Sequence, residues 1–261
     1  MSDSGQIRIR VLGNLGAHRS DGTEVHADEW RTGKTRDLVR LLALADPSPV
    51  RVPSLLEKLW PDAGVAVARN RLRTAASQIR RTLRDSHCLV RESDALRLQN
   101  VWVDVTAFRR LAARAHLAAR GGASSEVLDC ARAAQRLYQG DFHAHDDDSD
   151  WAVEERAHLQ RRLQEMLCEA AEAALDLGLF REALDLATST VQLEPTSETG
   201  HRVLMQAQAE LGEFAKALRV FETYRSGLAD ELGADPSPQT QELYLRILRG
   251  FSDSEASPLR R

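Results

Sequence analysis

The sequence predicts an α+β domain followed by an all-α domain, on two observations. The first hundred residues combine short alternating segments with an arginine-rich helical segment, whereas the remainder shows helical spacing and a 34-residue repeat. At 261 residues, 43% of them hydrophobic, the chain is long enough for each domain to bury a core. We expect the domains at residues 1–104 and 105–250, and a disordered tail at 251–261.

The charge is divided unevenly between the two parts of the chain. Residues 1–100 hold 17 Lys and Arg against 12 Asp and Glu, while the rest of the chain holds 18 against 27. A basic first part and an acidic second part favour nucleic-acid binding by the first part only.

Location in the cell follows from two further features. The sequence contains no run of about 18 apolar residues and no signal peptide. The three cysteines are far apart and lack metal-ligand spacing, so we expect buried, reduced thiols at Cys88, Cys130 and Cys168. These features indicate a cytoplasmic protein without membrane contact.

The N-terminal segment predicts a β-hairpin. Ile7, Ile9 and Val11 alternate with arginines, which is the pattern of a half-buried strand. A turn at residues 20–23 should lead into a second strand at residues 23–26, which would pair with the first.

Three helices should follow the hairpin. Thr32 can cap the first, which must end at or before Asp46 because prolines follow. The second begins at residues 53–54 and ends before Pro61. The third covers residues 66–84. Its apolar stripe, which should face the core, consists of Leu72, Ala76, Ile79 and Leu83.

The opposite face of the third helix is strongly basic. Residues 69–84 include six arginines and no acidic residue. Like charges repel along a helix, so this face should meet an anionic partner. Arginines can reach phosphates and guanines, and the short side chains of Thr74, Ser77 and Gln78 can approach base edges. The alternative is an arginine-rich face that meets only solvent.

A second hairpin should follow the third helix, with strands at residues 88–91 and 96–98. This order of elements is that of a winged helix-turn-helix, in which the third helix enters the major groove of double-stranded DNA. We expect contacts to bases from Arg73, Thr74, Ser77 and Gln78. We expect contacts mainly to phosphates from Arg69, Arg71, Arg80, Arg81, Arg84, Lys34, Arg91 and Arg97.

A nucleotide site at residues 33–35 is not favoured. Gly-Lys-Thr there resembles the end of a phosphate-binding loop, but the pattern requires Gly at position 28, which is Asp. Lys34 should instead lie in the first turn of a helix near DNA. Because no nucleophile with a base and no metal quartet can be identified, we expect neither an enzyme nor a cofactor.

Beyond residue 104 the spacing is helical. The His- and Asp-rich stretch at residues 143–150 favours an exposed acidic loop over a metal site. Aromatic side chains at Tyr138, Phe142 and Trp151 should pack in the core of the helical domain.

A repeat defines the architecture of this second part. Residues 177–184 recur at 211–218, an offset of 34 residues, which is the tetratricopeptide period. Gly178 and Gly212 would permit the tight turns, and an alanine five residues after each glycine would let the paired helices approach. The complete prediction is therefore an α+β winged helix-turn-helix followed by an all-α tetratricopeptide-like helical repeat domain.

Several motifs resemble a known family. Residues 55–60, 69–72 and 79–83 resemble the OmpR-type winged helices of the Streptomyces antibiotic regulatory protein (SARP) family. Features at residues 138–156 and 231–240 resemble the bacterial transcriptional activation domain (BTAD) that follows this winged helix. The chain departs from the family in the hairpin, where Asp94-Ala95 stands in place of a common Gly-Tyr.

The resemblance implies a sequence-specific DNA-binding transcriptional activator. It also implies binding as a homodimer to direct repeats near promoters, recruitment of RNA polymerase, and activation of a secondary-metabolite (antibiotic) gene cluster. The residues themselves leave two other functions open. One is a helical-repeat scaffold for protein interaction, and the other is a regulator gated by a small molecule in the repeat domain.

Overall fold

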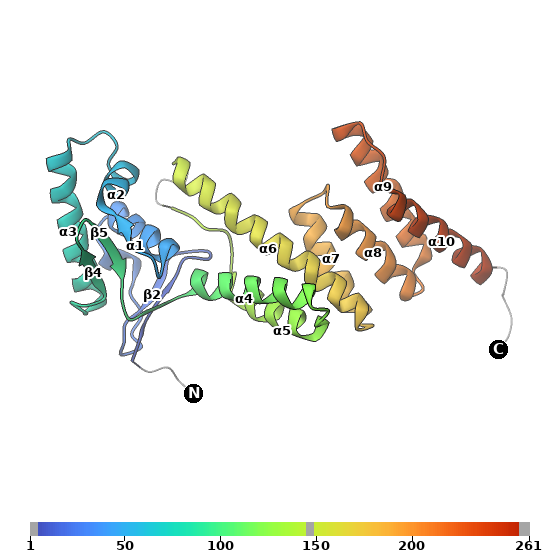
Figure 1. Cartoon of the computed structure of the whole chain (residues 1–261), viewed down its shortest axis with the longest axis horizontal. Helices are drawn as coiled ribbons and strands as arrows, with labels where there is room; N and C mark the ends of the chain where they lie inside the picture. The colour runs from blue at the N-terminus through green and yellow to red at the C-terminus, as the bar shows by residue number, and fades with distance from the viewer. Residues whose placement is uncertain (1–4, 145–148, 256–261) are drawn as a thin grey trace. The chain divides into compact units, whose positions relative to one another are not determined.

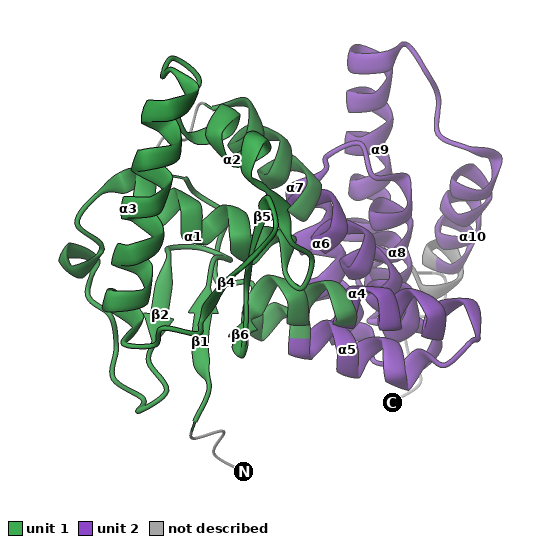
Figure 2. Ribbon diagram, turned by 60° about the vertical axis from the view of Figure 1, so that its left-hand side comes forward, with its two compact units in different colours: residues 1–110, 134–159 green, residues 111–133, 160–261 purple. Residues whose placement is uncertain are grey.

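The computed structural model describes residues 5–144 and 149–255 (Figure 1). By their internal contacts the residues form two compact units, 1–110 with 134–159, and 111–133 with 160–261 (Figure 2). The first unit is α+β and the second is a series of helices, so the predicted fold class is confirmed.

A three-stranded sheet lies at the N-terminus of the first unit. Strand β1 (Ile7–Arg10) pairs antiparallel with β2 (Gly16–His18) and parallel with β6 (Val101–Val103), in the order β2-β1-β6. Ile7 and Ile9 are buried, as the alternation predicts. The role of residues 101–103 as a sheet strand is not evident from the sequence, because a parallel partner 94 residues away in the chain leaves no local signal.

The predicted second strand at residues 23–26 is wrong. Only an isolated bridge joins His18 to Glu24, and the strand that pairs with β1 lies before the turn. The chain cannot continue as a strand because a 3-10 helix, η1 (Ala27–Trp30), begins immediately afterwards and buries Trp30.

Three helices and a hairpin complete the winged helix-turn-helix. These are α1 (Gly33–Ala45), α2 (Val52–Leu59) and α3 (Val65–Leu83), then β4 (Leu89–Glu92) and β5 (Ala95–Leu98), with β3 (Val50–Arg51) at the edge of the hairpin. Thr32 caps α1 as predicted, since its Oγ1 accepts a hydrogen bond from the Thr35 amide at 3.1 Å. Each predicted helix and the predicted hairpin are confirmed.

The first unit also includes residues beyond 104. They come from the start of α4 (Asp104–Arg120), the end of α5 (Ser124–Leu137) and the start of α6 (Asp150–Asp176). The fully buried carboxylate of Asp104 accepts hydrogen bonds from the amides of Val11 and Leu12. Burial raises the pKa of this carboxyl, and these amides oppose the shift.

Aromatic side chains in residues 134–159 pack in the first unit rather than in the repeat core predicted from the sequence. Phe142 lies edge-on to Trp151 with ring centroids 5.9 Å apart, and Tyr138 contacts Phe108 at 5.5 Å. The segment joins this unit because it packs against the N-terminal sheet region. A Cβ added to Gly13 would lie 3.5 Å from the Gly140 amide nitrogen. The domain boundary at residue 104 stays a prediction.

The second unit contains the repeat. After α6 come α7 (Phe180–Leu193), α8 (Glu198–Glu210), α9 (Phe214–Leu232) and α10 (Pro238–Glu255). Gly178 and Gly212 have φ values of 72° and 77° in the turns before α7 and α9, and Ala183 and Ala217 are fully buried. The turns and close approaches predicted from the repeat are confirmed.

The C-terminal end differs from its prediction. Helix α10 continues to Glu255, past the expected start of the tail at residue 251, and residues 256–261 lie outside the described residues. Its start is fixed by Glu198, whose Oε1 accepts hydrogen bonds from the Ser237 amide and the Thr240 hydroxyl. The expected acidic loop at residues 143–150 includes residues 145–148, which lie outside the described residues.

Two other predictions can be compared with the structure. Cys88, Cys130 and Cys168 form no disulfides, but only Cys88 and Cys130 are buried as predicted, whereas Cys168 is half-buried. Burial raises the pKa of the Cys88 thiol to about 11. Among the described residues, no helix combines the length and the apolar composition that a membrane crossing requires.

Candidate nucleic-acid interface

Helix α3 is held to the first unit by one apolar face. Leu72, Ala76, Ile79 and Leu83 are buried as predicted, together with Ala68 and Ala75. This face packs on α1, α2 and η1. The burial of these side chains fixes which side of the helix meets solvent.

The other face of α3 is exposed and carries no acidic side chain. Its exposed residues from position 70 onward are Asn70, Arg71, Arg73, Thr74, Ser77, Arg81 and the C-cap residue Arg84. The helix therefore displays a continuous basic and hydrogen-bonding surface, as the sequence predicts.

Two residues of the predicted interface are drawn toward neighbouring elements. Gln78 is half-buried, and its Oε1 accepts a hydrogen bond from the Thr35 hydroxyl of α1 at 2.7 Å. Arg80 is also half-buried, and its Nε and Nη2 donate to the Leu89 carbonyl of β4 at 3.2 and 2.8 Å. Gln78 thus links α3 to α1, and Arg80 links α3 to the hairpin.

The arginines around the hairpin pair with hairpin carboxylates. Arg97 contacts Glu92 at 2.5 Å. Asp94 lies 3.5 Å from Arg69 of α3 and 3.8 Å from Arg91 of β4. In the free protein, each of these three predicted phosphate contacts therefore has an acidic neighbour.

A cavity of about 170 Å³ lies between α3 and the hairpin. Four arginines line it, namely Arg69, Arg73, Arg80 and Arg91. Its apolar lining consists of Val52, Leu72, Ala76 and Leu96. The sequence predicts the arginines individually, but their grouping depends on the docking of the hairpin beside α3.

Lys34 and Arg71 come together at the other end of α3. Both line a cavity of about 510 Å³ beside the α2–α3 connection. Lys34 lies in the first turn of α1, as predicted. The cavity brings the two cations to the side of the molecule where α3 begins.

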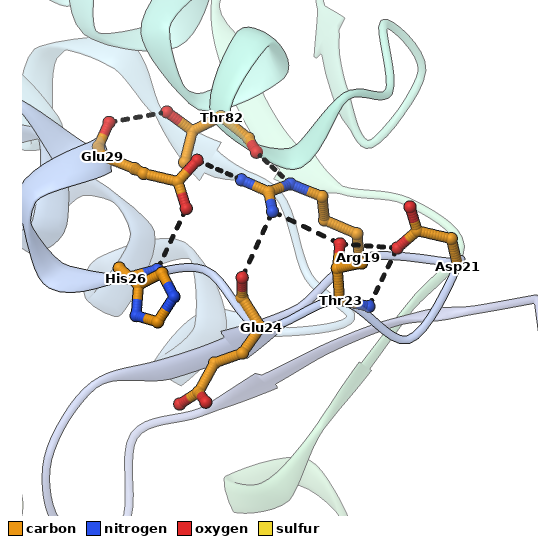
Figure 3. Close-up of polar contacts among 7 residues, drawn as sticks. All are labelled: Arg19, Asp21, Thr23, Glu24, His26, Glu29 and Thr82. Atoms are coloured by element: carbon orange, nitrogen blue, oxygen red, sulfur yellow. Dashed lines mark hydrogen bonds and ion pairs between the residues drawn. The ribbon is translucent and has the colours of Figure 1, made fainter.

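Arg19 is a positioning residue that sequence reasoning missed (Figure 3). Its side chain is only 5% exposed, and its Nε donates to the Thr82 carbonyl near the end of α3 at 2.8 Å. Its Nη1 donates to the Thr23 hydroxyl and the Glu24 carbonyl, and its Nη2 is paired with Glu29. No local pattern distinguishes this arginine from an exposed one, because its partners come from three separate segments.

Glu29 completes the link between the turn and α3 (Figure 3). Its backbone carbonyl accepts a hydrogen bond from the Thr82 hydroxyl at 3.0 Å. The His26 amide donates to its carboxylate and, with Arg19, holds the pKa of that carboxyl below its ordinary value. The carboxylate is therefore ionised at neutral pH, and the Arg19–Glu29 pair fixes the C-terminal end of the basic helix.

Comparison with known proteins identifies the family. Residues 103–248 match the model described as the bacterial transcriptional activator domain. The chain belongs to this family. The resemblance to the SARP family is confirmed by regulatory protein DnrI of Streptomyces peucetius, which is 30% identical over 93% of this chain and 92% of its own length.

Two further matches are to proteins that are longer than this chain. Regulatory protein AfsR of Streptomyces coelicolor is 30% identical over 95% of this chain, which spans a quarter (25%) of that relative. The solved structure of Mycobacterium tuberculosis EmbR, in complex with a low-affinity phosphopeptide, matches with a TM-score of 0.78 and 25% identity. The match covers 98% of this chain and 66% of the EmbR chain. DnrI and AfsR are both named as regulatory proteins.

Proposed function

We propose that the protein is a sequence-specific DNA-binding transcriptional activator whose helix α3 enters the major groove. The single observation that supports this most strongly is the exposed face of α3, which carries arginines and short polar side chains and no carboxylate. A protein surface with this composition fits the negative charge of DNA and the hydrogen-bonding edges of its bases.

The candidate residues have one of two roles in this proposal, base reading or phosphate contact. Arg73, Thr74 and Ser77 read bases, because all three are exposed in the part of the helix that helix-turn-helix proteins bring nearest the groove. Gln78 approaches the bases from the α1 side, where Thr35 orients its amide. The phosphate contacts come from Arg69, Arg71, Arg80, Arg81, Arg84, Lys34, Arg91 and Arg97.

The helical unit supplies protein contacts. Its repeats offer helical surfaces, and the acidic balance of the chain beyond residue 100 disfavours DNA there. Family membership supports contacts with RNA polymerase and with a second copy of the chain on direct repeats near a promoter. The SARP resemblance supports an antibiotic biosynthetic cluster as the target.

The test is selection of duplexes from a random DNA pool by the full chain, followed by footprinting and in vitro transcription. We expect one enriched motif, arranged as direct repeats, and transcription that depends on it. Binding without any enriched sequence would favour the protein-interaction scaffold. Binding that changes with added metabolites would favour the ligand-gated regulator.

Replacement of two arginines separates base reading from phosphate contact. Arg73→Ala should cost about 1–3 kcal/mol on the selected site and relax the preference at one base position. Arg81→Ala should weaken selected and scrambled DNA alike, and should lower the slope of log K against log salt by about one unit. The measurement is a salt titration of each variant on both duplexes.

A buried residue of the same helix serves as the control. Leu72 is 5% exposed, so Leu72→Ala should reduce the free energy of unfolding by about 2–5 kcal/mol. The two arginine variants should unfold like the unaltered chain, because both side chains are exposed. If both arginine variants lose equal affinity on both duplexes, Arg73 does not read bases.

A further inference from the structure

The turn of the hairpin places a carboxylate among the arginines proposed to meet DNA. Asp94 Oδ1 lies 3.5 Å from Arg69 Nη1 on α3 and 3.8 Å from Arg91 Nη2 on β4. Both arginines line the cavity between α3 and the hairpin. One acidic side chain thus pairs with two of the four arginines that line this cavity and offsets one of their two positive charges.

We propose that Asp94 is an electrostatic brake on DNA binding, which competes with phosphate for Arg69 and Arg91. The proposal rests on the proposed function and adds to it a residue that sets the strength of DNA binding. A phosphate that binds these two guanidinium groups competes with the carboxylate for their positive charge, and it lies at short range from the carboxylate. Like charges in contact repel, so Asp94 opposes the approach of any DNA backbone.

The turn that carries Asp94 is held by contacts other than those of the Asp94 side chain. The turn is held through the backbone, since the Val52 amide donates to the Asp94 carbonyl at 2.7 Å and β4 pairs with β5 along its whole length. The Asp94 side chain is 48% exposed, and exposed ion pairs contribute little to folding. Their effect on binding is larger, because a phosphate replaces the water that screens them.

The ion pairs also set the salt dependence of binding. Arginines whose charge is partly offset by Asp94 displace fewer counterions from DNA than free arginines would. Asp94→Asn keeps the size of the side chain and removes its charge. This variant should bind both selected and scrambled duplexes about three- to twentyfold more tightly at low ionic strength. The slope of log K against log salt should become steeper by about one to two units.

The experiment compares full-length variants on the selected duplex and on a scrambled duplex, by fluorescence anisotropy over a range of salt concentrations. Glu24→Gln is the matched control, because it makes the same change in net charge at an exposed position that lines neither of the cavities lined by Arg69. A third comparison places Asp94→Asn in a chain that already carries Arg69→Ala and Arg91→Ala. Thermal unfolding of each variant checks that the fold is intact.

The expected result is a larger gain for Asp94→Asn than for Glu24→Gln, and the loss of that excess when both arginines are absent. An equal gain in the two single variants, or a gain that persists without the arginines, would overturn the brake and leave the proposed function standing. If neither the unaltered chain nor Asp94→Asn binds any duplex, the brake and the proposed function both fall. Binding by Asp94→Asn alone would support both.

Discussion

A fragment that ends at residue 104 is expected to be far less stable than a fragment that ends at residue 159. Residues after 104 hold the end of α1, since the Thr106 hydroxyl donates to the Asp46 carboxylate at 2.9 Å and Arg109 donates to the Leu44 carbonyl. The shorter fragment also lacks Phe108 and Phe142, which are fully buried in the first unit. We expect a loss on the order of 5 kcal/mol, which is comparable to the whole stability of a small domain.

The measurement is urea unfolding of both fragments, monitored by circular dichroism and by tryptophan fluorescence. Two substitutions in α4 of the full chain serve as a matched pair. Phe108→Ala should cost about 3–5 kcal/mol, whereas Leu117→Ala, at a position that is 68% exposed, should change the stability by less than about 0.5 kcal/mol. Equal stability of the two fragments would show that the domain boundary predicted at residue 104 is correct.

Arg19→Met should destabilise the protein by about 3 kcal/mol, although it replaces one long side chain by another. The Arg19 side chain is only 5% exposed. Its guanidinium donates hydrogen bonds to the carbonyls of Thr82 and Glu24. Removing it leaves the two carbonyls without this donor and the Glu29 carboxylate without its cationic partner, with only the His26 amide still donating to it, which costs more than an ordinary hydrogen bond. Urea denaturation monitored by circular dichroism measures the loss.

The double variant Arg19→Met/Glu29→Gln tests whether the pair explains this loss. If it does, the two changes should destabilise by less than the sum of the single changes, because the second no longer leaves a charge unpaired. Arg110→Met is the control, since Arg110 is exposed on α4 and should tolerate the same replacement. A loss of less than about 1 kcal/mol for Arg19→Met would contradict the anchoring role.

The sequence predicted those parts of the fold that depend on local periodicity. The stripe that includes Leu72 and Ile79 identified the buried face of α3, and the glycines at 178 and 212 identified the turns of the repeat. Contacts between distant segments left no such pattern. The parallel pairing of residues 101–103 with β1 is one example, and the packing of Phe142 in the first unit is another.

The candidate interface was also predicted from the sequence only in part. The arginines of α3 were predicted individually from their spacing, because a helix fixes which residues share a face. Arg19 and the cavity between α3 and the hairpin could not be predicted, since each requires three or more segments to meet. Asp94 stood out in the sequence as a departure from the family, but only the structure places it between Arg69 and Arg91.

The contact between Arg80 and Leu89 has a consequence for the evolution of the hairpin. Arg80 donates twice to a main-chain carbonyl, which every amino acid provides, so these two hydrogen bonds between α3 and β4 would form with any side chain at position 89, although Leu89 itself is buried. Substitutions elsewhere in the hairpin, including those at positions 94 and 95, can accumulate while these two hydrogen bonds are retained. Because of Arg80, the DNA contacts of the hairpin can change in evolution without a change in helix α3.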